Sequence, residues 1–208
     1  MKCVHSSALL AAVPLAFVAA CTKPPPPPIL SLDGRQCTAL PDLATAHPVL
    51  ANDKDVSVTL DDKTGCLDVH AARKLAYVAF GLPDISQPYL LSVTSIPIGE
   101  GLFFPKLTLL DGTGKVVREI PADTFLPHGA ALHAGLRPHP EERYLIVSSD
   151  PTTIGQTNSQ LTEGIQVNGF MAGGIYVQVQ TGLEGKSSFT HAYNGTVDVK
   201  ATLVPVAK

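Results

Sequence analysis

The chain has 208 residues, a formal net charge of -3 and 45% hydrophobic against 16% charged residues, with frequent Gly and Pro and no Trp. This length and composition are typical of one turn-rich β-domain and argue against a helical protein or a second full-size domain. No cluster of Lys or Arg interrupts the sequence, which argues against nucleic-acid binding.

The first twenty residues have the pattern of a lipoprotein signal peptide. Lys2 supplies the positive start, Ala8–Ala20 forms an apolar run too short to span a bilayer, and the small residues Ala19 and Ala20 precede Cys21. We therefore expect cleavage before Cys21 and attachment of lipid to its sulfur. The alternative is an ordinary secretory signal, which also ends in small residues.

The segment 21–30 predicts a tether between the lipid and the folded domain. Pro24–Pro28 should form polyproline II, a stiff spacer of roughly 15 Å. Thr22, rather than Asp, follows the expected lipidated Cys21, which favours the outer membrane over the inner one. The predicted location is thus the periplasm, with the lipid in the inner leaflet of the outer membrane.

Four cysteines are present, and two are expected to remain for pairing. Cys3 leaves with the signal and Cys21 carries lipid, so Cys37 and Cys66 should form a disulfide in an oxidising compartment. Closing that loop is worth roughly 3 to 4 kcal/mol on the chain-entropy model. Two free buried thiols are the alternative, and the absence of a Cys-x-x-Cys spacing argues against a redox-active pair.

Residues 31–208 are predicted to form a single all-β domain, an antiparallel, jelly-roll-like β-sandwich of about eight or nine strands. Asp111–Gly114 should turn a β-hairpin, and the apolar run in Arg143–Ser149 indicates a central strand buried on both faces. The predicted strands are Val56–Leu60, Leu75–Phe80, Tyr89–Ile96, Pro105–Leu110, Lys115–Ile120, Ala131–Leu136, Arg143–Ser149, Gly174–Thr181 and Gly195–Val204.

The stretch Thr152–Thr162 is polar, contains Gly and is the longest stretch without a strand signal, so we expect a binding loop there. The candidate ligand-binding residues are Thr152, Thr153, Gln156 and Asn158, together with Tyr144 as an aromatic face for a sugar. A tyrosine in a predicted strand is alternatively a half-buried sheet residue.

Catalytic and metal-binding patterns are weak. His128, His133 and His139 lie near Glu141 and Glu142, but their spacing matches no zinc pattern and the adjacent prolines indicate an exposed loop. Neither G-x-S-x-G nor H-E-x-x-H occurs. We expect no catalytic residues, no metal and no cofactor.

The run from Phe103 to Arg118, followed by Leu136 and by Arg143–Asp150, resembles the maltose operon periplasmic protein (MalM) family. The resemblance covers roughly the middle two-fifths of the chain and implies a secreted protein that accompanies maltose and maltodextrin uptake. The family has no established catalytic residues to carry over. The same strand pattern also resembles bacterial pre-peptidase C-terminal β-sandwiches.

These observations predict a non-catalytic outer-membrane lipoprotein that supports carbohydrate uptake by binding a maltodextrin or a porin. The alternative is a structural or assembly lipoprotein of the envelope that binds only protein partners. A hydrolase of envelope glycans is a third hypothesis, and no nucleophile or acid pair stands out in its favour.

Overall fold

The computed structural model describes residues 26–52, 54–69, 73–172 and 175–205, and within 158–187 it gives the course of the backbone alone. The predicted signal and Cys21 lie outside these residues. The described part contains fourteen strands and one short 3-10 helix, η1 (Ala122–Thr124). The all-β sandwich is confirmed, with more strands than the eight or nine expected. None of the described residues forms a helix long and apolar enough to cross a membrane.

The first sheet has six strands, in the order β1-β4-β11-β7-β8, with β3 also paired to β4. Only the short β1–β4 contact is parallel; the other pairs of this sheet are antiparallel. The strands are β1 (His47–Pro48), β3 (Cys66–Val69), β4 (Arg73–Gly81), β7 (Pro105–Leu110), β8 (Val116–Ile120) and β11 (Tyr144–Ser149).

The second sheet has five antiparallel strands in the order β2-β14-β5-β10-β9. Its alternating sequences place one row of side chains inward: Leu91 and Val93 of β5 and Val197 and Val199 of β14 are fully buried. The strands are β2 (Val56–Leu60), β5 (Tyr89–Ile96), β9 (Leu126–His128), β10 (Ala131–Leu136) and β14 (Gly195–Leu203).

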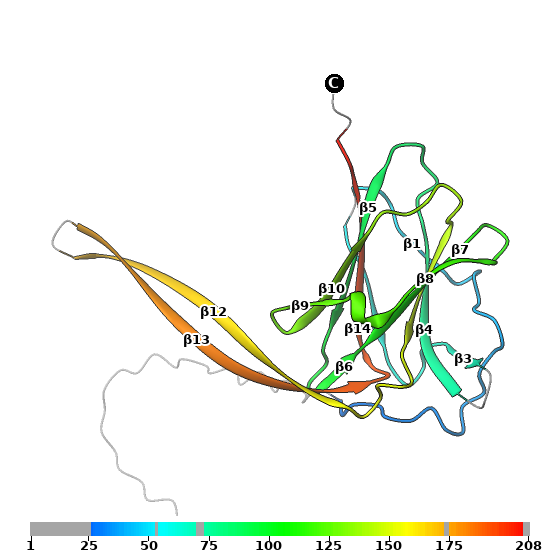
Figure 1. The fold of residues 1–208 in the computed structure, drawn as a ribbon, viewed down its shortest axis with the longest axis horizontal. Coiled ribbons are helices and arrows are strands. Elements are labelled where there is room, and N and C mark those ends of the chain that lie inside the picture. Colours follow the sequence, from blue (N-terminus) through cyan, green and yellow to red (C-terminus); the bar gives the residue numbers. More distant parts are fainter. Residues whose placement is uncertain (1–25, 53, 70–72, 173–174, 206–208) are drawn as a thin grey trace, which may run out of the picture.

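One hydrophobic core fills the space between the two sheets (Figure 1). Phe80, Leu107 and Leu145 of the first sheet meet Leu91 and Val199 of the second, and all five side chains are inaccessible to solvent. Each such residue contributes roughly 1.5 to 3 kcal/mol through removal of its apolar surface from water. The sandwich is therefore held mainly by sheet-to-sheet burial.

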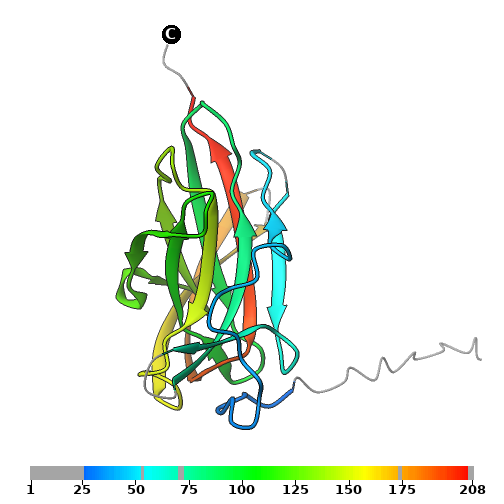
Figure 2. The same ribbon diagram turned by 90° about the vertical axis from the view of Figure 1, so that its right-hand side faces the viewer.

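The outer face of the first sheet is apolar as well, and the N-terminal segment covers it (Figure 2). Leu43 and Ala46 pack against Tyr77, Ala79 and Ile146 there. The Tyr77 hydroxyl accepts a hydrogen bond from the backbone N–H of Asp42 at 2.9 Å. This cover explains why β11 is apolar on both faces, as its sequence predicted.

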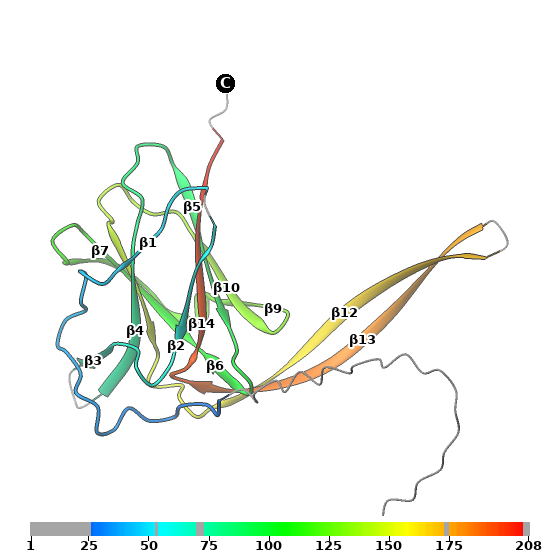
Figure 3. The same ribbon diagram turned by 180° about the vertical axis from the view of Figure 1, so that it is seen from behind.

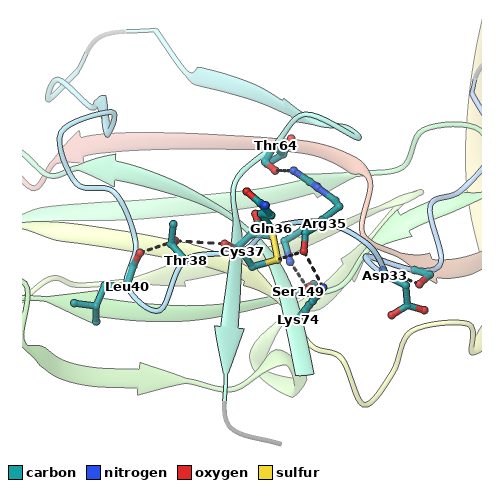
Figure 4. Close-up of a disulfide and its surroundings, with 12 residues drawn as sticks. Asp33, Arg35, Gln36, Cys37, Thr38, Leu40, Thr64, Lys74 and Ser149 are labelled. Carbon is teal, nitrogen blue, oxygen red and sulfur yellow. Dashed lines mark hydrogen bonds between the residues drawn. A yellow bond between two sulfur atoms is a disulfide. The ribbon is translucent and has the colours of Figure 1, made fainter. Parts of the chain in front are cut away.

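A disulfide joins the N-terminal segment to β3, as expected: Cys37 and Cys66 are bonded, with their Cα atoms 4.8 Å apart (Figure 4). Backbone hydrogen bonds reinforce the link, because Thr38 donates to the Cys66 carbonyl at 3.0 Å and accepts from Asp68 at 2.8 Å. The Lys74 ammonium donates to the Arg35 carbonyl at 2.8 Å. The segment is thus fixed at the edge formed by β3 and β4.

The predicted β-hairpin is present as β7 and β8. The Asp111 carboxylate accepts hydrogen bonds from the Thr113 hydroxyl and from the backbone N–H groups of Thr113 and Lys115. These bonds, the Thr113 hydroxyl first, hold the pKa of Asp111 below its usual value. Gly114 closes the turn at φ +85°, a conformation that side chains disfavour.

A long two-stranded ribbon projects from one end of the sandwich (Figures 1 and 3). It consists of β12 (Thr157–Ala172) and β13 (Ile175–Ala192), which pair antiparallel along their length. At its base, Thr190–Ala192 of β13 pair in parallel with β6 (Gly101–Phe103).

The prediction of a loop over Thr152–Thr162 is wrong in its second half, because β12 begins at Thr157. Of the strand predicted over Gly174–Thr181, residues 175–181 form the first part of the longer β13, and Gly174 lies outside the described residues. Runs rich in Gly, Gln and Asn give little strand signal, and cross-strand pairing rather than local preference determines this structure.

The chain enters the sandwich beside the base of the ribbon. Buried Asn194, between β13 and β14, accepts a hydrogen bond from the Ile29 N–H at 2.9 Å and donates to the Pro27 carbonyl at 3.5 Å. The Tyr193 N–H donates to the Ile29 carbonyl at 2.9 Å. Hydrogen bonds to the sandwich are therefore already present within the expected tether, at Pro27 and Ile29.

Candidate functional site

The polar residues predicted to bind a ligand in the Thr152 loop bond mostly to one another. The Asp150 carboxylate accepts hydrogen bonds from the N–H and hydroxyl of Thr152, at 2.9 and 2.6 Å. The Thr153 hydroxyl donates to the Asp150 carbonyl and the Gln156 amide to the Thr152 carbonyl, at 3.1 and 3.0 Å. These bonds build a turn after β11. The side chain of Asn158 lies outside the described atoms.

Tyr144 is not part of this group. It begins β11, where it pairs with Gly81 and Leu110, whereas Thr152 follows the other end of that strand. Its half-buried ring packs with the cluster on the outer face of the first sheet. The structure therefore does not bring Tyr144 together with Thr152, Thr153 and Gln156, and it places Tyr144 in a packing role.

A cavity of about 740 Å³ opens at one end of the sandwich, and we take it as the candidate site. Its walls come from the β4–β5 connection, residues 83–88, from the β10–β11 connection, residues 137–143, and from β8. Apolar wall is supplied by Pro83, Ile85, Pro88, Ile120, Leu136 and Pro138. A volume of this size accommodates a small organic ligand or a few sugar rings.

An ion pair lies in the wall of this cavity. Glu142 has a side chain with no solvent exposure, and Arg118 of β8 meets it with Nε to Oε1 at 2.9 Å and Nη2 to Oε2 at 3.0 Å. The backbone N–H of His139 also donates to Oε2, at 2.8 Å. Removal of one partner from a buried pair typically costs roughly 3 to 5 kcal/mol, so this arrangement is rigid.

Two further guanidinium groups line the cavity. Arg143 pairs with Asp84, whose side chain is 79% exposed, through Nη2 to Oδ1 at 3.0 Å, and also donates to the Pro140 carbonyl. Arg137 is exposed, and its side chain has no ion-pair partner in the described part of the chain. Arg118 donates through Nη2 to the Arg137 carbonyl at 3.1 Å, which ties the two residues together.

Tyr89 brings a hydroxyl to the same cavity from the start of β5. Burial raises the pKa of Tyr89 to about 12, against an opposing effect of the Arg143 charge and smaller raising effects of Glu142 and Asp84. The hydroxyl therefore stays protonated at neutral pH. It donates to the Pro83 carbonyl over a long 3.5 Å.

Sequence reasoning did not single out Arg118, Arg137 and Arg143, because Arg118 lies on β8 and meets the two arginines of the β10–β11 connection only in the fold. Glu142 was considered as a metal ligand beside His139, and it holds Arg118 instead. The one sequence feature that pointed to this region was the Pro-rich connection before β11.

The histidines considered for zinc do not converge. His133 of β10 lies at 3.2 Å from the Thr94 hydroxyl through Nδ1, and the Nδ1 of His139 lies at 3.7 Å from a Glu141 oxygen. Among the described residues no group of three or more His, Cys, Asp or Glu side chains is placed to hold a metal ion.

Comparison with known proteins does not name a family. No family model, no curated protein and no solved structure matches this chain.

Proposed function

We propose that this protein is a non-catalytic lipoprotein of the outer membrane whose periplasmic sandwich binds a glycan in support of carbohydrate uptake. The observation that carries the proposal is the cavity between the β4–β5 and β10–β11 connections, which combines apolar walls with convergent arginines and a protonated Tyr89. Such a mixture of apolar surface and a few fixed hydrogen-bond donors is typical of small-molecule sites.

The position of the cavity fits a protein tethered at its N-terminus. In the β5–β14 pair, Tyr89 lies opposite Leu203 and Ile96 lies opposite Thr196, so the cavity and the Asn194 contact to Pro27 are at opposite ends of the sandwich (Figure 1). The strands between them span roughly 23 Å at a rise of about 3.3 Å per residue. A lipid on Cys21 would hold the ribbon end near the membrane and turn the cavity toward the periplasm.

The disulfide supports the proposed periplasmic location. Bonds such as Cys37–Cys66 form and persist in oxidising environments, including the periplasm. Together with the signal pattern and the maltose operon resemblance, it favours an exported envelope protein.

Isothermal titration tests the proposal, with a soluble chain that begins at Thr22 so that the Pro27 and Ile29 contacts are kept. The ligands are maltose, longer maltodextrins and unrelated glycans. We expect saturable heat with one or more of the glycans. Absence of heat with every glycan would contradict glycan binding.

Two glycine variants localise the site. A Cβ at Gly135, which lines the cavity, or at Gly81, which does not, meets no atom within 4 Å. Gly135→Leu should narrow the cavity and weaken the binding heat, whereas Gly81→Leu should leave the heat unchanged. Equal effects of the two variants would place the glycan elsewhere.

A second candidate function is a structural or assembly lipoprotein that binds only protein partners, and the projecting ribbon favours it. Among the described residues β13 pairs with β6 only through Thr190–Ala192, and no other described strand pairs with the outer edge of the ribbon, which leaves it open to strand addition. Crosslinking in intact envelopes, with and without residues 160–187, tests this function. Partner bands that depend on the ribbon, with no glycan binding, would support it.

A further inference from the structure

We propose that the arginine-lined cavity selects oligosaccharides that carry a carboxylate over neutral ones. The inference rests on the proposed function and names the ligand class of the same site. It follows from how the charges around the cavity are paired.

Arg118 is held in place by the protein's own carboxylate. Glu142 occupies its Nε and Nη2 edge and is itself fully buried, so a ligand cannot displace it. The Arg118 side chain is 29% exposed, and its Nη1 group takes no part in the bonds to Glu142. A donor that is fixed before the ligand arrives loses little conformational entropy on binding.

Because Glu142 neutralises Arg118, the positive charge open to a ligand comes from Arg137 and Arg143. Arg137 has no acidic partner in the described residues, and Arg143 shares its charge with an aspartate that is largely in water. A carboxylate arriving at the cavity can take the free fork of Arg137 and compete with Asp84 for Arg143. Arginine binds carboxylates through two parallel hydrogen bonds, a geometry that hydroxyl groups of neutral sugars do not reproduce.

The acidic groups nearby do not remove this preference. Glu142 is occupied by Arg118 and the His139 N–H, while Asp84 and Glu141 are exposed side chains outside the cavity lining. The cavity lining thus contains three arginines and one acidic residue, in a chain whose net charge is -3. Neutral sugars would leave Arg137 without a charged partner.

The test compares three probes by isothermal titration against the chain from Thr22: trigalacturonate, maltotriose and triglutamate. We expect saturable binding of trigalacturonate, at least about tenfold tighter than maltotriose and weakened by added salt, because charge-assisted hydrogen bonds carry the difference. Triglutamate should bind more weakly than trigalacturonate.

Arg137→Gln should weaken trigalacturonate binding by about ten- to hundredfold and leave maltotriose binding unchanged. The matched control is Arg73→Gln, which removes the same charge from exposed Arg73 of β4, outside the cavity lining. Both arginines are exposed, so both variants should fold, and circular dichroism checks this.

Binding of maltotriose with no binding of trigalacturonate would overturn the inference and leave the proposed function intact. Equal or tighter binding of triglutamate would overturn the assignment to glycans and indicate an acidic peptide. Failure of all three probes would overturn the inference, and failure of the wider glycan set as well would overturn the proposed function. Equal losses in Arg137→Gln and Arg73→Gln would show that net charge alone determines binding.

Discussion

Individual side chains at the cavity end depend on partners that are distant in sequence. Arg118 and Glu142 are 24 residues apart, and neither has a local pattern that indicates the other. By contrast, the Cys37–Cys66 pair could be predicted, because the signal pattern accounted for the other two cysteines and left a single pairing. Residue roles were thus predictable where elimination left one choice. They were not predictable for pairs such as Arg118 and Glu142, which are brought together only by the tertiary structure.

Tyr89 provides a pH-dependent test at this scale. Because burial raises its pKa to about 12, the folded protein holds the proton while an unfolded tyrosine loses it near pH 10. The unfolded state is therefore favoured increasingly as pH rises, and the stability contributed by Tyr89, complete below about pH 10, should be lost by about pH 12.

Tyr89→Phe should remove this contribution, which shows as a shallower fall in the free energy of unfolding between about pH 10 and 12. The difference in tyrosinate absorbance between the parent protein and the variant isolates the Tyr89 titration, with an expected midpoint near 12. A midpoint near 10 would mean that the Tyr89 hydroxyl is solvated rather than buried.

At the level of elements, strands with clean alternation or continuous apolar runs were predictable from the sequence. β2 and β5 match their predicted bounds, and the β7–β8 hairpin turns at the predicted residues. β12 was not predictable, because its Gly, Asn and Gln residues carry no strand preference and its partner is β13 alone over most of its length. The short strands β1, β6 and β9 depend on neighbours in the same way.

The N-terminal segment behaves as an element because the disulfide closes a loop between it and β3. Replacement of both Cys37 and Cys66 by Ser should lower the free energy of unfolding by about 3 to 4 kcal/mol, from the loop entropy restored to the unfolded chain. Denaturant unfolding measures the change. Amide exchange should rise at Asp42, whose N–H bonds to Tyr77.

The parent protein under reducing conditions should match the double Ser variant, and reductant should not affect that variant. A parent protein whose stability does not respond to reduction would show that the segment is held by its packing on Tyr77 and Ile146, without help from the disulfide.

For the whole molecule, the two ends of the sandwich differ in structure. The chain enters at the end where Asn194 binds Pro27 and Ile29 and from which the ribbon projects, and the cavity opens at the other end. This arrangement was beyond sequence reasoning, because it depends on which strand ends lie together. The signal pattern, in contrast, lies within the first twenty residues, so it predicts a lipid anchor at Cys21 without knowledge of the fold.

The anchor itself is tested by changing Cys21. Once its signal is cleaved, Cys21→Ser protein should be found in the soluble periplasmic fraction rather than the membrane fraction, because the proposed acyl chains on Cys21 would contribute roughly 0.8 kcal/mol per buried methylene and the Ser hydroxyl would not carry them. The disulfide and the sandwich should be unaffected, since Pro27 and Ile29 keep their contacts. Cys3→Ser is the matched control and should leave the protein in the membrane fraction, because Cys3 is removed with the signal. If Cys21→Ser protein whose signal has been cleaved, as its intact mass shows, stays with membranes after a high-salt wash, the attachment comes from the folded domain, and the projecting ribbon becomes the first segment to delete.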